Sequence, residues 1–159
     1  MAKLRDLVRM SDQDAQDYVT RQRDMHVSTL NRDGSVQMTT NWFGLDDGLI
    51  VFNSYEASQK MVNLRRDPRI TVLFASGDRY RELAGVSIRG KVRFADDPDE
   101  NLRLLRLIAE RNEAFVDRSV TGDATPENKA AKRICVTIEP EKVISWDHSK
   151  LPVIGQSEA

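Results

Sequence analysis

The chain has 159 residues, a length that suits one domain built around a single hydrophobic core. Charged residues make up 31% and the net charge is -1, so overall charge gives no reason to expect binding to nucleic acid. A single cysteine, Cys135, excludes an intrachain disulfide and a cysteine-based zinc cluster, as is typical of a reducing compartment.

The apolar segments are too short for the roughly 18 residues that a membrane span needs, and residues 1–10 lack the apolar core of a signal peptide. We therefore expect a cytoplasmic protein whose partners include neither membrane nor nucleic acid.

The first half of the chain predicts one short helix and three strands. The helix covers residues 11–22, because Ser11 starts a run like a capping box and two acids in the first turn suit the helix dipole. Strands are expected at residues 25–30, 35–43 and 49–52, with glycine-containing turns at 31–34 and 46–48. Both faces of the 35–43 strand are partly apolar, as expected where the outside of a barrel is covered.

The second half predicts two further helices and more strands. A helix over 58–66 ends at Asp67-Pro68, and a long helix over 98–118 begins with a capping Asp97 and with Pro98 at its first position. Strands are expected at residues 70–74, 86–94, 133–138 and 143–146, the last two meeting in a turn at 139–141. Residues 119–132 show no helical pattern and are expected to form a long polar connection, a type of segment that often acts as a lid. Residues 153–159 form a polar tail.

About six strands joined mainly by hairpins indicate a mainly β fold, an antiparallel β-barrel with appended helices. We expect one domain over residues 1–159, with its core at about residues 24–147.

The passage between Asn53 and Lys60 is the strongest candidate for a binding site. An apolar strand ends there in small polar residues and leads into the start of a helix. Helix starts carry unpaired N–H groups and a partial positive charge, so a lysine in the first turn is poorly placed unless an anion is bound. Lys60, with Ser54 and Ser58, therefore predicts an anion site, although a solvated lysine would give the same pattern.

Several longer motifs surround this passage. They include Ser35-Val-Gln-Met-Thr-Thr-Asn-Trp-Phe43, Leu49-Ile-Val-Phe-Asn-Ser54, the run Lys60-Met-Val-Asn-Leu-Arg-Arg-Asp-Pro-Arg69, and Gly85-Val-Ser-Ile-Arg-Gly-Lys-Val92. Together they resemble the pyridoxamine 5'-phosphate oxidase-like split barrel family, in particular its flavin- or deazaflavin-dependent oxidoreductases. The resemblance implies a six-stranded antiparallel split barrel that forms a homodimer, with each cofactor in a groove between subunits.

The resemblance also implies a site. Lys60 and Ser58 match the positions that hold the cofactor phosphate, with Gln59 beside them, and Asn53 and Ser54 end the strand that lines the same pocket. The residues that match the strand beside the cofactor ring are Met38, Thr39 and Thr40. The family often has arginine or proline near this strand, and this chain has neither between Met38 and Asn41.

The implied activity is hydride transfer to or from a small conjugated organic substrate, carried by F420 or FMN. Because the cofactor supplies this chemistry, no catalytic residue is named. The basic residues Arg89, Lys91 and Arg93 form a stripe for which a solvated strand face is the simpler explanation. If the stripe binds a ligand, it would suit the oligoglutamate tail of F420, which places F420 before FMN.

Two alternatives stay open. One is pyridoxamine 5'-phosphate oxidase itself, although residues 146–152 lack the arginine-containing pattern of that enzyme. The other is a protein that binds flavin, haem or tetrapyrrole without turnover. The run Asp147-His148-Ser149 is not expected to form a triad, because consecutive residues on an extended chain diverge. No metal site is predicted, since His26 has no cluster of ligands beside it.

Overall fold

The computed structural model describes residues 3–122 and 124–152. Seven antiparallel strands form one curled sheet in the order β2-β1-β5-β6-β7-β4-β3. Their bounds are β1 Asp24–Leu30, β2 Val36–Trp42, β3 Gly44–Asp46, β4 Leu49–Tyr55, β5 Arg69–Ser76, β6 Ala84–Phe94 and β7 Arg133–Asp147. The mainly β, antiparallel character is confirmed. The expected number of six strands is wrong, because β3 adds a short strand that pairs with β4.

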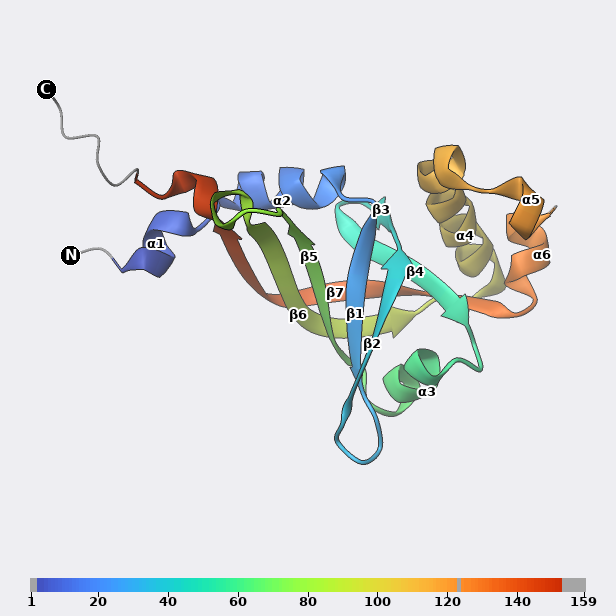
Figure 1. Ribbon diagram of the computed structural model, residues 1–159. Helices are drawn as coiled ribbons and strands as arrows, with labels where there is room; N and C mark the ends of the chain where they lie inside the picture. Colours follow the sequence, from blue (N-terminus) through green and yellow to red (C-terminus); the bar gives the residue numbers. More distant parts are fainter. Residues whose placement is uncertain (1–2, 123, 153–159) are drawn as a thin grey trace, which may run out of the picture.

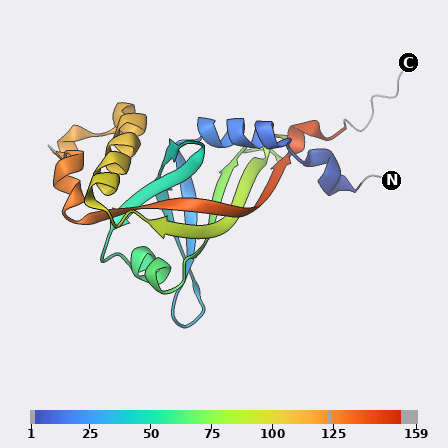
Figure 2. The same ribbon diagram turned by 180° about the vertical axis from the view of Figure 1, so that it is seen from behind.

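Helices lie at both ends of the sheet and below it (Figure 1). The α-helices are α1 Leu4–Val8, α2 Asp12–Arg21, α3 Gln59–Arg66, α4 Pro98–Asn112, α5 Arg118–Thr121 and α6 Pro126–Ala130, with 3-10 turns η1 Tyr80–Glu82, η2 Glu113–Phe115 and η3 His148–Lys150. Both views place α4, α5 and α6 together at one end of the sheet and α1 at the other (Figures 1 and 2). None of the helices in the described part of the chain combines the length and apolar character that a membrane crossing requires.

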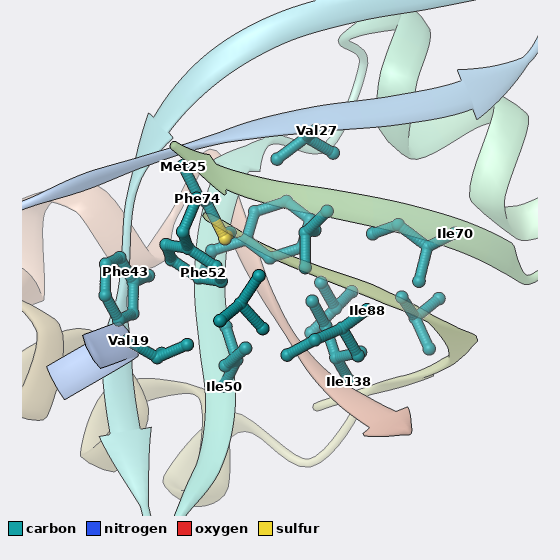
Figure 3. Packing of buried hydrophobic residues seen from close by; sticks show 14 of the residues in the cluster. Val19, Met25, Val27, Phe43, Ile50, Phe52, Ile70, Phe74, Ile88 and Ile138 are labelled. Carbon is teal, nitrogen blue, oxygen red and sulfur yellow. The ribbon is translucent and has the colours of Figure 1, made fainter. Parts of the chain in front are cut away.

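The main core fills the inside of the curled sheet, where side chains from strands far apart in the sequence point toward one another (Figure 3). Strand alternation supplies these side chains, since every second residue faces inward. Phe43 and Phe74 pack edge to face with ring centroids 5.1 Å apart. Val19 of α2 closes one side of this core, which explains why the short polar helix predicted at residues 11–22 forms, with Ser11 as its cap.

The final strand corrects the sequence analysis. Residues 133–138 and 143–146 were expected to form a hairpin, but they are two parts of β7, a single strand of 15 residues. Both parts pair with β6, and the register shifts at Arg89/Gly90 opposite Pro140. Proline lacks a backbone N–H and suits such an irregularity, and Gly90 is needed there because a side chain would overlap the Glu139 carbonyl. The turn-like sequence 139–141 therefore marks a bulge.

A second correction concerns the segment after α4. The long helix ends at Asn112 rather than near Arg118, and two short helices replace the connection expected over 119–132. Thr125 caps α6 by accepting a hydrogen bond from the Asn128 backbone, and Pro126 takes its first position. The tail predicted at 153–159 lies outside the described residues.

Helix α4 packs against the outer face of β4 and β7 through a second apolar cluster. This cluster consists of Val51, Ala95, Leu104, Leu105, Ile108 and Cys135. Ion pairs fix the helix further, since Arg103 binds both carboxylate oxygens of Asp46 at 2.9 and 2.8 Å and Arg106 binds Glu127 of α6 at 2.8 Å. Helices α4 and α6 are thereby held beside the end of the sheet that carries the candidate site.

The first and last strands of the sheet order, β2 and β3, are not paired with each other, so the barrel is open along one side. Helix α3 lies beneath this opening, near the β1–β2 hairpin (Figure 1). The buried Asn63 connects them by donating to Asn31 Oδ1 at 2.8 Å and Thr29 Oγ1 at 3.1 Å. The asparagine of the Lys60-x-x-Asn63 motif thus orients the helix that carries Lys60.

Candidate functional site

The candidate site begins where β4 ends and α3 starts. Ser58 is the N-cap residue of α3, but its hydroxyl makes no capping hydrogen bond. It pairs instead with the Ser54 hydroxyl, with the two oxygens 3.1 Å apart. The first N–H groups of the helix are therefore left without a side-chain cap, an arrangement that favours a bound anion.

Side chains rather than backbone bonds bridge β2 and β4 at this point. The Asn41 amide donates to the Asn53 carbonyl at 3.2 Å, and the Lys60 ammonium donates to Asn41 Oδ1. On the other side, Arg133 donates to Asn53 Oδ1 at 3.1 Å and lies over the ring of Tyr55 at 4.1 Å. Two asparagines thus hold a lysine from α3 and an arginine from β7 near each other. We call this group, which consists of Asn41, Asn53, Lys60 and Arg133, the seam.

These two cations interact with neutral acceptors. Within residues 3–122 and 124–152, neither Lys60 nor Arg133 forms an ion pair with a carboxylate. Burial, together with the charge of Arg133, lowers the pKa of Lys60 below its ordinary value. Two neighbouring positive charges without a counterion form a site that an anion would stabilise.

A cavity of about 960 Å³ opens beside this pair. Its walls come from the ends of β2, β4 and β7 and from helices α4, α5 and α6, which lie side by side in Figures 1 and 2. Asn41, Asn53 and Arg133 belong to its lining. The bridged seam is therefore one wall of a space large enough for an organic ligand.

Comparison with known proteins identifies the family. Residues 11–147 match the family described as pyridoxamine 5'-phosphate oxidase. The chain belongs to this family. No curated protein matches the sequence.

Solved structures include relatives of this pyridoxamine 5'-phosphate oxidase family member. A conserved hypothetical protein from Mycobacterium tuberculosis is 31% identical over 99% of both chains, with a TM-score of 0.79. A structure named F420 reductase is 20% identical over 80% of this chain and 94% of its own, with a TM-score of 0.63. A heme binding protein from Mycobacterium smegmatis is 14% identical over 90% of this chain and 60% of its own, with a TM-score of 0.64. The last two show a shared fold only.

The residues that the family resemblance selected fall into two groups in the structure. Asn53 and Lys60 belong to the seam, whereas Ser54 and Ser58 pair with each other beside it, at the start of α3. Gln59 instead turns toward its own helix and donates to Asn63 Oδ1 at 2.9 Å.

The three positions on β2 lie on both faces of that strand. Thr39 faces the seam and donates to Asn41 Oδ1 at 3.4 Å. Met38 and Thr40 lie on the outer face, where Met38 is 59% exposed and the Thr40 hydroxyl contacts His26 Nδ1 at 3.3 Å. Thr40 also reaches the lining of the cavity.

Sequence reasoning missed Asn41, Tyr55 and Arg133. No local signal marks Arg133, which lies 80 positions from Asn53 and reaches it only because β4 and β7 are neighbouring strands. Asn41 could have been suspected, since it shares the inner face of β2 with Thr39.

The basic stripe on β6 is largely paired. Lys91 lies 3.5 Å from Glu141 and Arg93 lies 3.0 Å from Glu100, and both side chains are more than half exposed. This arrangement matches the solvated strand face considered above. In the described part of the chain, no group of three or more His, Cys, Asp or Glu side chains is arranged to hold a metal ion.

Proposed function

We propose that this chain is an oxidoreductase that uses F420, or alternatively FMN, for hydride transfer to or from a small conjugated organic substrate. The observation that carries the proposal is the meeting of Lys60 and Arg133 at the seam without a carboxylate between them. Both cofactors carry a phosphate, and Arg and Lys are the side chains that bind phosphate most strongly.

The seam and the start of α3 beside it fit a phosphate in three respects. Lys60 and Arg133 supply charge, Ser54 and Ser58 supply hydroxyl donors, and the uncapped start of α3 supplies backbone N–H groups. A flavin-type cofactor would bring the hydride chemistry itself. The protein would then hold the phosphate, orient the ring against β2 and exclude water.

The name of the F420 reductase among the structural relatives supports F420 as the first choice. The basic stripe no longer favours F420, since Lys91 and Arg93 already have acidic partners. Haem fits the cavity less well, because its described lining contains no histidine, cysteine or methionine, which are common haem ligands.

The proposal includes a homodimer. The outer face of β2, an edge strand, exposes Val36 and Met38 at 59% each and Trp42 at 40%. Cross-strand register leads from Thr40 on this face through His26, Leu73 and Ser87 to Ile144, which is 43% exposed, so polar side chains separate Ile144 from the apolar residues of β2. Large apolar side chains exposed together on an edge strand are typical of an interface between subunits.

Titration of the apoprotein with F420 and with FMN, followed by fluorescence, tests the cofactor proposal. Lys60→Ala should weaken binding by about 1.5 to 3 kcal/mol, the contribution of a charge-assisted hydrogen bond. Arg133→Ala should have a similar effect, and Lys132→Ala, an exposed lysine outside the seam, should have none. Failure of both cofactors to bind, or equal affinities in all variants, would reject the proposal.

Sedimentation tests the dimer. Met38→Glu should produce a monomer, because it places a charge in the apolar face of β2. Leu4→Glu, at an equally exposed leucine on α1, should leave the dimer intact. A monomeric parent protein would contradict this part of the proposal.

A further inference from the structure

The cavity beside the seam has features that the cofactor phosphate does not explain. Its volume of about 960 Å³ lies at the upper end of the range for pockets that bind organic ligands. Much of its lining belongs to α4, α5 and α6, which lie beyond the residues assigned to the cofactor. Its chemistry can be described from its charges and its apolar wall.

The lining carries a positive charge within residues 3–122 and 124–152. In this part of the lining, Arg118, Lys129 and Arg133 are basic and Glu113, which is already paired with Arg118, is the one acid. Arg133 already bonds Asn53 at the seam, so the half-buried Lys129 is the remaining basic side chain that could bind a ligand in the cavity. In the part of the chain that the structure describes, the Lys129 ammonium has no ion pair or hydrogen bond. An anionic ligand group would supply its missing partner.

The rest of the lining is largely apolar. Trp42 contributes an indole, and the other apolar residues are Leu105, Ile108, Ala109, Val116, Val120, Ala124 and Pro126. A surface of this type favours a ligand with a flat apolar or aromatic body.

Asn112 is a fixed part of the protein rather than a ligand contact. It is only 1% exposed, and its amide nitrogen donates to the carbonyls of Phe43 at 3.1 Å and Ile108 at 2.8 Å. These bonds join the end of α4 to the residue that precedes β3 and so hold this wall of the cavity in place.

We propose that this cavity binds the substrate, and that the substrate is an anionic aromatic molecule. Lys129 would bind its anionic group and the apolar wall would bind its ring. The role as substrate rests on the oxidoreductase proposed above. The cavity and the cofactor site share Asn41, Asn53 and Arg133, so a ligand in the cavity would lie next to the cofactor.

Anilinonaphthalene sulfonate is a suitable probe, because it combines fused aromatic rings with an anionic sulfonate. We would titrate the full-length apoprotein with this probe and with uncharged N-phenylnaphthylamine, which lacks the sulfonate. Lys129→Ala should lower the affinity for the anionic probe by about tenfold, the lower end of the effect of losing a charge-assisted contact. The affinity for the neutral probe should stay unchanged. Lys132→Ala, an exposed lysine outside the cavity, is the matched control.

A second variant fills the cavity. Ala109 lies on α4 in the lining, so Ala109→Phe should abolish binding of both probes while the affinity for F420 or FMN stays the same. Equal binding by Lys129→Ala and Lys132→Ala, or unchanged probe affinity in Ala109→Phe, would overturn the inference.

The cofactor titration separates the two proposals. If Ala109→Phe lowers the affinity for F420 or FMN as strongly as it lowers the affinity for the probes, the cavity binds the cofactor and the substrate assignment is wrong. If neither cofactor binds the parent protein while the probes respond as expected, the oxidoreductase proposal fails and the ligand class of the cavity stands.

Discussion

Replacement of Asn63 by alanine should destabilise the protein strongly, although the change removes only a small polar group. Asn63 is fully buried between α3 and the β1–β2 hairpin. Its amide nitrogen donates to Asn31 Oδ1 and Thr29 Oγ1, and its oxygen accepts from Gln59. All of these bonds are lost in Asn63→Ala.

The expected loss of stability can be worked out from these contacts. The two shorter bonds that Asn63 donates, to Asn31 and Thr29, each contribute about 1 kcal/mol, and a third, to Gln37 at 3.4 Å, is weaker. Thr29 is 2% exposed and has no other side-chain hydrogen bond in the described structure, so its hydroxyl would be left buried and unpaired, which costs about 1 to 3 kcal/mol. Gln59 is exposed and can bind water instead. The sum is about 3 to 5 kcal/mol.

Urea unfolding of the parent protein and the variant measures this difference. We expect a lower midpoint with an unchanged slope, which indicates a change in stability rather than in the unfolded state. Gln59→Ala is the matched control, because it removes one exposed partner of the same amide and should cost less than about 1 kcal/mol. A loss below about 1 kcal/mol in Asn63→Ala would show that the buried network does not hold α3 in place.

Three further predictions concern pH, reactivity and packing. Burial and the charge of Arg133 lower the pKa of Lys60 below 10.5, and a bound phosphate would raise this pKa again. The affinity for the cofactor should therefore fall as the pH rises through the lowered pKa of Lys60. Lys60→Arg should remove this pH dependence in the fluorescence titration. Burial raises the pKa of the Cys135 thiol to about 12, so a thiol reagent followed by absorbance should react with the unfolded but not the native protein. A side chain at Gly90 would overlap the backbone carbonyl of Glu139, so Gly90→Ala should cost about 1 to 3 kcal/mol in urea unfolding, and an unchanged midpoint would refute this close approach.

Local signals in the sequence were enough to predict most of the helices and strands. The alternation over residues 86–94 predicts β6 with its inner and outer faces, because each side chain of a strand has a fixed direction. The Asp97-Pro98 start predicts α4, since capping depends on residues next to one another. The local sequence was not sufficient where the same residues are compatible with two different structures. Glu139-Pro140-Glu141 resembles a turn, and only pairing of both flanking segments with β6 makes it a bulge.

The candidate site divides in the same way. Ser54, Ser58 and Lys60 are close in sequence, and the strand end and helix start that hold them can be predicted from that passage alone. Arg133, Asn41 and the helices that wall the cavity could not be predicted, because their positions depend on which strands become neighbours in the sheet. That choice is made by burial of the whole core, to which distant segments contribute together. The sequence by itself therefore determined the lysine side of the site, and the tertiary structure alone decided which arginine and which cavity lie beside it.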